Sequence, residues 1–315
     1  LVGSVRCVYE TAYDSVSVSS EVLFQPEQVS AVMRRAFHAL RNGRPGPVIV
    51  EIPGDVGEME VDDSIVASYS PPKRHRFAPS NDDVKKAVEI LLAAKKPVIW
   101  SGMGVLMSGA SDELTELAEL TEIPVYCTMP GKSGFEQRHP LSLGSGSGAT
   151  SQEARTWLQE SDVLFAVGSS MSRTSYGQPI PDGKVIVHNT ETVEDLNKDF
   201  SVDCGLVGDA KLTLQMIIEE VKSQIGTNGR KGQTGIADEI KKIHNEWMSK
   251  WNDVLSTDET PISGYRVIGE MVKVLDLENS VVTHDAGAPR DMIMPFYPGT
   301  VPHSYVGWGK TTHLG

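Results

Sequence analysis

Along much of the chain, apolar residues at helical spacing alternate with short continuous apolar runs. Predicted helices cover residues 82–94, 111–121, 151–160 and 210–221, and predicted strands cover 97–100, 124–128, 163–167, 184–188 and 204–207. Continuous apolar strands that alternate with helices are typical of a parallel sheet covered on both faces. We therefore predict a doubly wound α/β domain, in which a ligand would bind at the carboxyl ends of the strands.

Before this domain, the pattern predicts only one helix and one strand. The helix opens at Pro26 and keeps its helical spacing of apolar residues until Gly43, a natural stop. The strand covers residues 48–52, and the polar, proline-containing stretch 58–80 that follows is typical of a surface linker. One helix and one strand are typical of the end of a domain rather than of a whole one.

After the central domain, the pattern becomes helical again. The glycine-rich segment 226–235 predicts a flexible hinge, and Ile236–Trp251 predicts an amphipathic helix. A helix over 263–275 leads into a strand at 280–284, and Asp285–Pro289 predicts a strand-to-helix turn. A further domain therefore begins near the C-terminus.

These elements divide the chain into five segments. They are 1–60, the end of one α/β domain; 61–80, a linker; 81–225, a central Rossmann-like domain; 226–260, a hinge and linker helix; and 261–315, the start of another domain. Because the chain begins at Leu1 rather than Met and stops at Gly315 inside a motif, we expect it to be a piece of a longer protein.

Composition narrows the class of protein. The 315 residues suffice for two or three domains, and 39% hydrophobic with 23% charged residues is ordinary for a soluble globular protein. A net charge of −13 argues against a general nucleic-acid or anionic-membrane surface, and no apolar run approaches a membrane span. The three cysteines, Cys7, Cys127 and Cys204, fit neither a disulfide framework nor a zinc pattern, which favours a reducing, cytoplasmic location.

The last stretch of the chain carries two small-residue turns close together. The first is Asp285–Pro289 and the second is Gly307–Thr312. Glycine lets a ligand approach the backbone, and N–H groups at a helix start favour anions such as diphosphate, so we predict an anion site here. His284, His303 and His313 lie around these turns. A lone histidine is usually structural, but three of them favour a ligand contact, although they form no metal pattern.

Two other segments resemble phosphate loops less closely. Gly102–Gly109 follows a strand, but Met107 breaks the dinucleotide pattern G-x-G-x-x-G, so a plain strand-to-helix turn is at least as good an interpretation. Gly131–Ser133 resembles the end of a P-loop but lacks the first glycine of that motif, because Tyr126 stands there. We therefore reject the P-loop.

The segment Gly144–Thr150 leaves two interpretations open. A loop so rich in glycine either passes close to a ligand or is mobile and empty, and Thr150 with Glu153 fits a capping box for the next helix.

His244 lies on the amphipathic helix without a second histidine at metal spacing. A solvated helix face is therefore favoured there over a metal site.

Taken together, several segments resemble thiamine diphosphate enzymes of the acetolactate synthase type. The most specific, Gly43–Val56, is similar to the end of their pyrimidine-binding domain. Segments similar to their central domain are 97–104, 123–125, 139–144, 161–168 and 208–210. The stretch 281–315 resembles the start of their diphosphate-binding domain. The resemblance covers nearly the whole chain, in the family's order.

The resemblance implies where the cofactor lies. Against its diphosphate would lie Gly287, Ala288, Pro289 and Arg290. Beside the thiamine rings would lie Gly307, Trp308, Gly309, Lys310 and Thr311. The cofactor would supply the nucleophilic carbon and accept electrons as carbon dioxide leaves a 2-keto acid. Because the family's active site forms between subunits, a homodimer or higher homo-oligomer is implied.

Two groups of the family pattern fall outside this sequence. The glutamate that contacts the pyrimidine ring would precede Leu1, and the Gly-Asp-Gly…Asn motif that holds Mg²⁺ and the diphosphate would follow Gly315. We therefore predict no catalytic and no metal-binding residue within the chain, and no activity for the chain alone.

The central domain and the substrate leave alternatives open. Synthases of this type bind FAD there, with Arg173 as the candidate contact, but Gly168–Arg173 and Val187–Glu191 match the flavin pattern too loosely to claim FAD. An acetolactate synthase, a keto-acid decarboxylase and an acyl-CoA lyase of the superfamily all fit. The enzyme is the favoured hypothesis, and the bulky Trp308 and Lys310 keep open an alternative of a different class, a non-catalytic nucleotide-binding module with a decayed thiamine site.

Overall fold

The computed structural model describes residues 13–175 and 177–307. Contacts divide the chain into two compact units, Leu1–Arg76 and Phe77–Gly315. Within the described ranges, no helix combines the length and apolarity that a membrane crossing needs.

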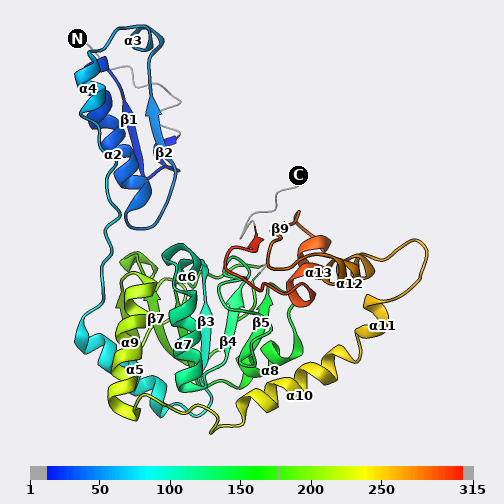
Figure 1. The fold of residues 1–315 in the computed structure, drawn as a ribbon. Coiled ribbons are helices and arrows are strands. Elements are labelled where there is room, and N and C mark those ends of the chain that lie inside the picture. The colour runs from blue at the N-terminus through cyan, green and yellow to red at the C-terminus, as the bar shows by residue number, and fades with distance from the viewer. Residues whose placement is uncertain (1–12, 176, 308–315) are drawn as a thin grey trace. The chain divides into compact units, whose positions relative to one another are not determined.

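The first unit packs a helix against a short pair of parallel strands. Strand β1 (Ser19–Val22) pairs with β2 (Val48–Glu51), and helix α2 (Val29–Arg41) contacts both (Figure 1). The apolar residues of α2 recur at helical spacing, and Val32 is buried among them in a small apolar cluster. Three shorter elements are η1 (Pro26–Gln28), α3 (Gly54–Gly57) and α4 (Asp63–Ala67).

Helix α4 lies within the stretch 58–80, where the polar composition predicts a surface linker. The Ser30 hydroxyl of α2 donates to the Ile65 carbonyl, and the Asn42 side chain accepts from the His75 N–H at 2.7 Å. Much of the predicted linker is therefore folded onto the first unit. Local composition misses this, because contacts with residues far away in the sequence hold the stretch in place.

A six-stranded parallel sheet forms the centre of the second unit and confirms the predicted fold class. Its strands are β3 (Val98–Ser101), β4 (Val125–Thr128), β5 (Ser142–Gly146), β6 (Val163–Val167), β7 (Val185–Thr190) and β8 (Cys204–Val207). They lie in the order β5-β4-β3-β6-β7-β8, and every neighbouring pair is parallel. The strand order reverses between β3 and β6, which is the switch point of a doubly wound sheet.

Helices cover both faces of this sheet (Figure 1). They are α5 (Asn81–Ala93), α6 (Met103–Ser108), α7 (Ser111–Thr121), α8 (Gln152–Glu160) and α9 (Ala210–Ile225), and a 3₁₀ turn η2 covers Val193–Asp195. In β3, Ile99 joins an apolar core with α5, α7 and α9, whereas Trp100 joins a second core with α8. Because both faces are buried, these strands are continuous apolar runs in the sequence.

Strand β5 is the element of this sheet that the apolar pattern misses. Its sequence Ser-Leu-Gly-Ser-Gly contains one apolar side chain, that of Leu143, and glycine is poor in strands. The strand forms because it adds to the edge of β4, where Ser142 pairs with Val125 and Gly146 with Thr128.

The C-terminal part of the second unit starts at an amphipathic helix and ends beside the central sheet. Its elements are α10 (Ile236–Met248), α11 (Asn252–Leu255), α12 (Gly264–Val274), β9 (Val282–Thr283), α13 (Ala288–Phe296) and β10 (Tyr305–Val306). β9 and β10 pair in parallel. The apolar cluster of these C-terminal elements includes Ile293 and Met294 of α13, and it also includes Met129 from just after β4. The C-terminal elements are therefore packed onto the carboxyl end of the central sheet.

The segment 226–235, predicted as a flexible hinge, is fastened to the end of α7. The Leu120 carbonyl accepts from the Arg230 N–H at 2.8 Å, and the Glu122 carboxylate accepts from the Thr234 N–H at 2.7 Å. The glycines permit the turns that bring these groups together, so the segment predicted as a hinge also makes defined contacts with the end of α7.

Candidate functional site

The predicted strand-to-helix turn lies between β9 and α13. Gly287 is the residue before the first turn of α13 and has φ 82° and ψ −138°, a conformation that other residues adopt only with strain. A Cβ on Gly287 would meet no atom within 4 Å. The turn therefore has open space at the end of the helix where unpaired N–H groups are expected to gather.

Ala288, Pro289 and Arg290 form the first turn of α13. Proline is tolerated there, because the first N–H groups of a helix have no partner within the helix. Arg290 is only 8% exposed, and its Nε donates to Asp291 Oδ1 at 3.0 Å. The turn thus carries a nearly buried guanidinium, which favours an anionic ligand, beside the carboxylate that orients it.

Strand β10 brings Tyr305 beside His284, which lies just after β9. His284 Nδ1 donates to the Asp285 carbonyl at 2.7 Å, so that its Nε2 accepts from the Tyr305 hydroxyl when the ring is neutral. Burial raises the pKa of the Tyr305 hydroxyl, which therefore stays protonated. A Cβ on Gly307 would lie 2.6 Å from that hydroxyl oxygen, so glycine is needed for this close approach.

Because β9 and β10 are parallel, the described residues that directly follow them, up to Arg290 after β9 and Gly307 after β10, leave the same edge of the small sheet. The described positions Gly287–Arg290 and Gly307 are thereby at one end of the β9–β10 pair. The remaining predicted contacts, Trp308, Gly309, Lys310 and Thr311, lie outside the described residues, as does His313. His303 is exposed, with φ 65°, in the turn before β10.

Lys132 is a buried basic residue next to this site that the sequence analysis missed. Its Nζ donates to Gln137 Oε1 at 2.5 Å, to Ser145 Oγ at 2.9 Å and to the Met294 carbonyl at 3.3 Å. The side chain is 0% exposed. A single lysine after a strand carries no periodic signal, so the local pattern gave no reason to select it beyond the rejected P-loop.

Burial sets the protonation of Lys132 and of its neighbour Cys127. Desolvation lowers the pKa of Lys132 to about 7, and the nearby Cys127 opposes that shift. Burial raises the pKa of the Cys127 thiol to about 11, so Cys127 stays a neutral thiol near pH 7. Lys132 is therefore charged for only part of the time near pH 7.

The glycines at the carboxyl end of β3 serve close packing. A Cβ on Gly102 would lie 2.3 Å from the Gly168 carbonyl oxygen, and one on Gly104 would lie 2.6 Å from Gly168 Cα. The Gly104 N–H also donates to the Gly168 carbonyl at 2.8 Å. Because backbone already fills the space beside these glycines, the strand-to-helix interpretation is supported and the nucleotide cradle is not.

The glycine-rich segment Gly144–Thr150 contacts protein. Ser147 Oγ donates to Asp291 Oδ1 of α13 at 3.2 Å. The predicted capping box is wrong: α8 begins at Gln152, and the Ser151 hydroxyl donates to the Leu143 carbonyl at 3.1 Å instead of capping the helix. The segment is therefore a docking surface for α13.

Glu153 is used in a contact between helices. It is 3% exposed, and its Oε1 lies 2.8 Å from His244 Nδ1 on α10. This hydrogen bond raises the pKa of His244. His244 is exposed, so it lies on a solvated helix face as predicted, and its ring in addition anchors α10 on α8. Within residues 13–175 and 177–307, no three His, Cys, Asp or Glu side chains are grouped to hold a metal ion.

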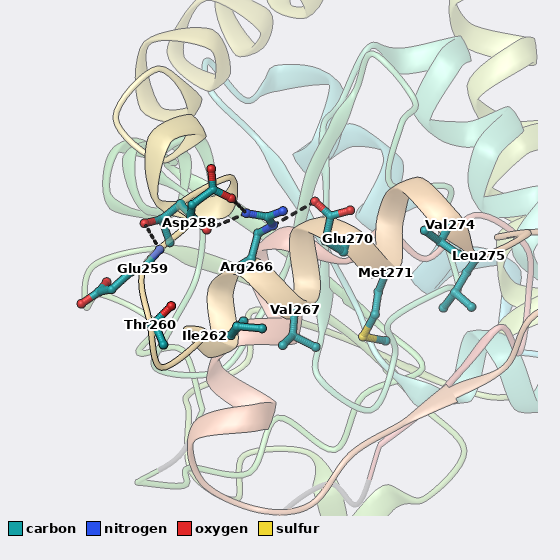
Figure 2. Close-up of a pocket in the computed structure, with 11 residues that line it drawn as sticks. Asp258, Glu259, Thr260, Ile262, Arg266, Val267, Glu270, Met271, Val274 and Leu275 are labelled. Carbon is teal, nitrogen blue, oxygen red and sulfur yellow. Dashed lines mark hydrogen bonds and ion pairs between the residues drawn. The ribbon is translucent and has the colours of Figure 1, made fainter.

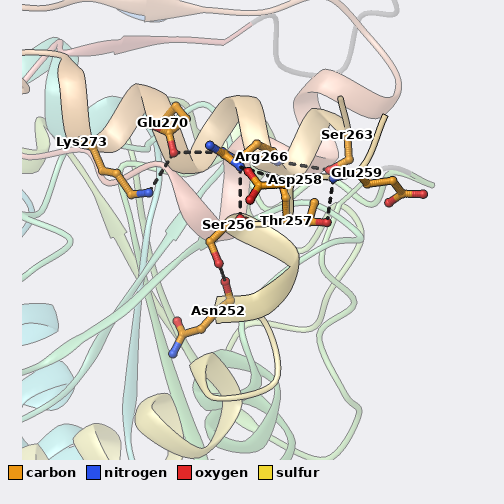
Figure 3. A network of polar contacts seen from close by, with 9 residues as sticks. All are labelled: Asn252, Ser256, Thr257, Asp258, Glu259, Ser263, Arg266, Glu270 and Lys273. Carbon is orange, nitrogen blue, oxygen red and sulfur yellow. Dashed lines mark hydrogen bonds and ion pairs between the residues drawn. The ribbon is translucent and has the colours of Figure 1, made fainter. Parts of the chain in front are cut away.

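A groove of about 610 Å³ runs along α12 (Figure 2). Its apolar lining includes Ile262, Val267 and Val274, while Arg266 is held between the two carboxylates of Asp258 and Glu270. Figure 3 shows the polar contacts that tie the loop before α12 to Arg266. Because both neighbouring carboxylates already bind the arginine, this network fastens a loop and presents no reactive group.

Comparison with known proteins identifies relatives. Residues 84–217 match the family model described as the central domain of thiamine pyrophosphate enzymes. A probable acetolactate synthase large subunit of Methanococcus aeolicus is 30% identical over 308 residues, which cover 91% of this chain and 50% of the relative. The corresponding protein of Methanocaldococcus jannaschii is 30% identical over 92% of this chain and 50% of its own length.

A glyoxylate carboligase of Escherichia coli O157:H7 is 31% identical over 267 residues, covering 81% of this chain and 43% of the relative. The chain thus spans about half the length of the curated relatives it matches. The match covers the central sheet and extends into both flanking parts.

Proposed function

Because this chain belongs to the thiamine pyrophosphate enzymes, we propose that it is part of a thiamine diphosphate-dependent carboligase or decarboxylase that acts on 2-keto acids. The observation that carries the proposal is the turn before α13, where Gly287 has φ 82° and open space beside it. Relatives named acetolactate synthase and glyoxylate carboligase support the 2-keto acid class.

The residues around this turn have distinct roles in the proposal. Gly287 lets the diphosphate approach the backbone, the start of α13 offers N–H donors, and Arg290 adds positive charge. Tyr305 stays neutral, and Gly307 allows the backbone after β10 to pass close to its hydroxyl. Bound thiamine diphosphate supplies the nucleophilic carbon and the electron sink, while the chain binds and orients it.

The domain assignment is part of the same proposal. The first unit would end a pyrimidine-binding domain, residues 81–225 would form the central domain, and residues from 261 would begin a diphosphate-binding domain. We also propose Mg²⁺ as the companion ion, a homo-oligomer of at least two subunits, and a cytoplasmic location. No magnesium ligand is assigned among the described residues.

A nucleotide role for the central domain receives less support. The Arg173 guanidinium, the candidate flavin contact, lies over the Phe200 ring at 4.7 Å from its centroid. The glycines Gly102 and Gly104 are packed on Gly168 and leave no room for a phosphate between them. We therefore assign no FAD and do not favour the non-catalytic nucleotide module.

Binding of the cofactor to the whole protein tests the proposal. Thiamine diphosphate with Mg²⁺ should stabilise the protein by about 2.7 kcal/mol at a hundredfold excess over its dissociation constant, measured as a thermal shift. Gly287→Ala should weaken that binding, because alanine is strained at φ 82°, whereas Gly148→Ala, in open space without positive φ, should not. No shift with saturating cofactor would refute the proposed function.

Activity measurements then separate the substrates. Acetolactate formed from pyruvate would support the synthase, and condensation of glyoxylate would support the carboligase, since relatives of both names match the chain. Carbon dioxide release with an aldehyde as the sole product would instead indicate a simple decarboxylase.

A further inference from the structure

We propose that Lys132 is a positioning residue: from the connection between β4 and β5 it holds α13, and thereby presents the turn Gly287–Arg290 to an anionic cofactor. The proposal rests on the proposed function, because the turn matters for catalysis only if it carries the diphosphate. Lys132 itself would touch neither cofactor nor substrate.

The burial and the hydrogen bonds of the Lys132 amine support this role in holding α13. The amine is fully buried, and it donates hydrogen bonds to the neutral oxygens of Gln137, Ser145 and Met294. A buried amine is costly unless its donors are satisfied. Two of the three acceptors come from the central domain and one from α13, so satisfying the amine joins the two.

The acceptor on α13 is the carbonyl of Met294, in the last turn of the helix. The last four carbonyls of a helix lack partners within it and carry partial negative charge, which a cation stabilises. Ser145 Oγ donates to the same carbonyl at 3.3 Å. Lys132 and Ser145 therefore fix the C-terminal end of α13.

Gln137 adds contacts with the chain that follows α13. Its Oε1 accepts from Lys132 and also from the Gly299 N–H at 3.2 Å, while its own N–H donates to the Gly299 carbonyl at 2.9 Å. A Cβ on Gly299 would lie 2.9 Å from the Ser133 backbone. The chain just after α13 is thus seated on the same loop that carries Lys132.

A separate contact holds the opposite end of the helix. Ser147 donates to Asp291, whose Oδ1 also accepts from Arg290. Met294 lies six positions after Ala288, which corresponds to about 9 Å along a helix axis. Along the helix Lys132 is therefore remote from the turn and acts on it through the placement of α13, and its Nζ also lies 5.7 Å from the centroid of the Tyr305 ring.

Hydrogen exchange in the 315-residue chain tests the docking without any cofactor. Lys132→Met should speed exchange in residues 288–299 by about tenfold and leave β6 unchanged, and Lys132→Arg should restore part of the protection. Lys184→Met is the control, because Lys184 is partly buried, whereas Lys132 is fully buried, and it likewise donates to a backbone carbonyl, that of Ser161 at 2.6 Å, away from α13. Unchanged exchange in 288–299, or equal loss in β6, would overturn the proposal.

Cofactor affinity in the whole protein tests the consequence. Lys132→Met should raise the dissociation constant of thiamine diphosphate, measured with Mg²⁺, by about tenfold, with partial rescue by Lys132→Arg. Ser147→Ala is a milder second variant that removes the contact at the other end of α13, and it should weaken binding in the same direction.

The possible failures are distinguishable. Suppose that hydrogen exchange in residues 288–299 rises in Lys132→Met, but that Lys132→Met and Ser147→Ala bind the cofactor as tightly as the original protein. Lys132 then has only a structural role and the proposal is wrong. If the original protein does not bind thiamine diphosphate, the proposed function fails and the role in cofactor placement fails with it, whatever the exchange rates show.

Discussion

Trp247 of α10 stacks on Phe296 at the end of α13, with ring centroids 5.2 Å apart and ring planes 4° from parallel. The Phe296 ring also meets Trp251 and Tyr265, with centroids 4.8 and 5.8 Å away. Four aromatic rings, from α10, the turn after it, α12 and α13, thus join the connecting helix to the helix that carries the proposed cofactor turn. The amphipathic pattern predicts α10 but not this partner.

Removal of the Phe296 ring should loosen this junction. Phe296→Ala leaves a gap among three aromatic rings, and we expect the second unit to lose about 2 kcal/mol of stability, less than for a fully buried phenylalanine. Urea unfolding followed by tryptophan fluorescence measures it. Phe24→Ala, with a side chain that is 71% exposed, is the control and should change little. Equal effects of the two variants would contradict the role of the junction.

The glycines at the end of β3 should be intolerant of a side chain. Gly102→Ala places a Cβ 2.3 Å from the Gly168 carbonyl oxygen, and because that atom belongs to the backbone it is expected to cost about 3 kcal/mol or more. Gly148→Ala has open space and should be nearly neutral. Thermal unfolding of the two variants gives the comparison. A stable Gly102→Ala protein would mean that the space is not filled by backbone and would reopen the ligand-cradle interpretation.

The buried amine of Lys132 predicts a stability that rises with pH. Its pKa is lowered to about 7 in the folded chain, whereas an exposed lysine has a pKa of about 10.4. Between these values the unfolded chain binds more protons, so stability increases with pH by up to about 1.4 kcal/mol per pH unit from this group. Lys132→Met removes the group.

The measurement is the difference in unfolding free energy between the original chain and Lys132→Met, followed from pH 7 to about 10. The difference should shift in favour of the original chain as pH rises. Lys184→Met serves again as the control, because Lys184 is only partly buried, whereas Lys132 is fully buried. A difference that does not depend on pH would show that Lys132 keeps an ordinary pKa.

His244 predicts the opposite dependence on pH. Its hydrogen bond to Glu153 raises its pKa, so the ion pair stabilises the fold below the ordinary histidine pKa and is lost as pH rises through the raised value. Because the His244 side chain is 47% exposed, the effect should be below about 1 kcal/mol.

His244→Gln should flatten this part of the stability profile between about pH 5 and 8, whereas His75→Gln, at an exposed position of the first unit, should leave it unchanged. Chemical unfolding at several pH values measures both variants. If the profile of His244→Gln matches the original chain, the pair with Glu153 does not form in solution.

The sequence by itself determined the central sheet and its helices. The apolar runs of β3 and β6 and the amphipathic spacing of α5, α7 and α9 depend on burial of whole faces, and that information repeats every few residues. The turn at Gly287 was equally readable, because only glycine suits that backbone conformation at the start of α13.

Tertiary structure alone decided which polar residues meet. Lys132 and Met294 are 162 positions apart, and Glu153 and His244 are 91 apart, so no local period relates them. Likewise β5 is a strand only because the edge of β4 is present to pair with it. Burial patterns are local and repeat along the chain, whereas a hydrogen bond between distant residues exists only after the fold has brought its donor and acceptor within 3 to 3.5 Å, roughly the limit for such a bond.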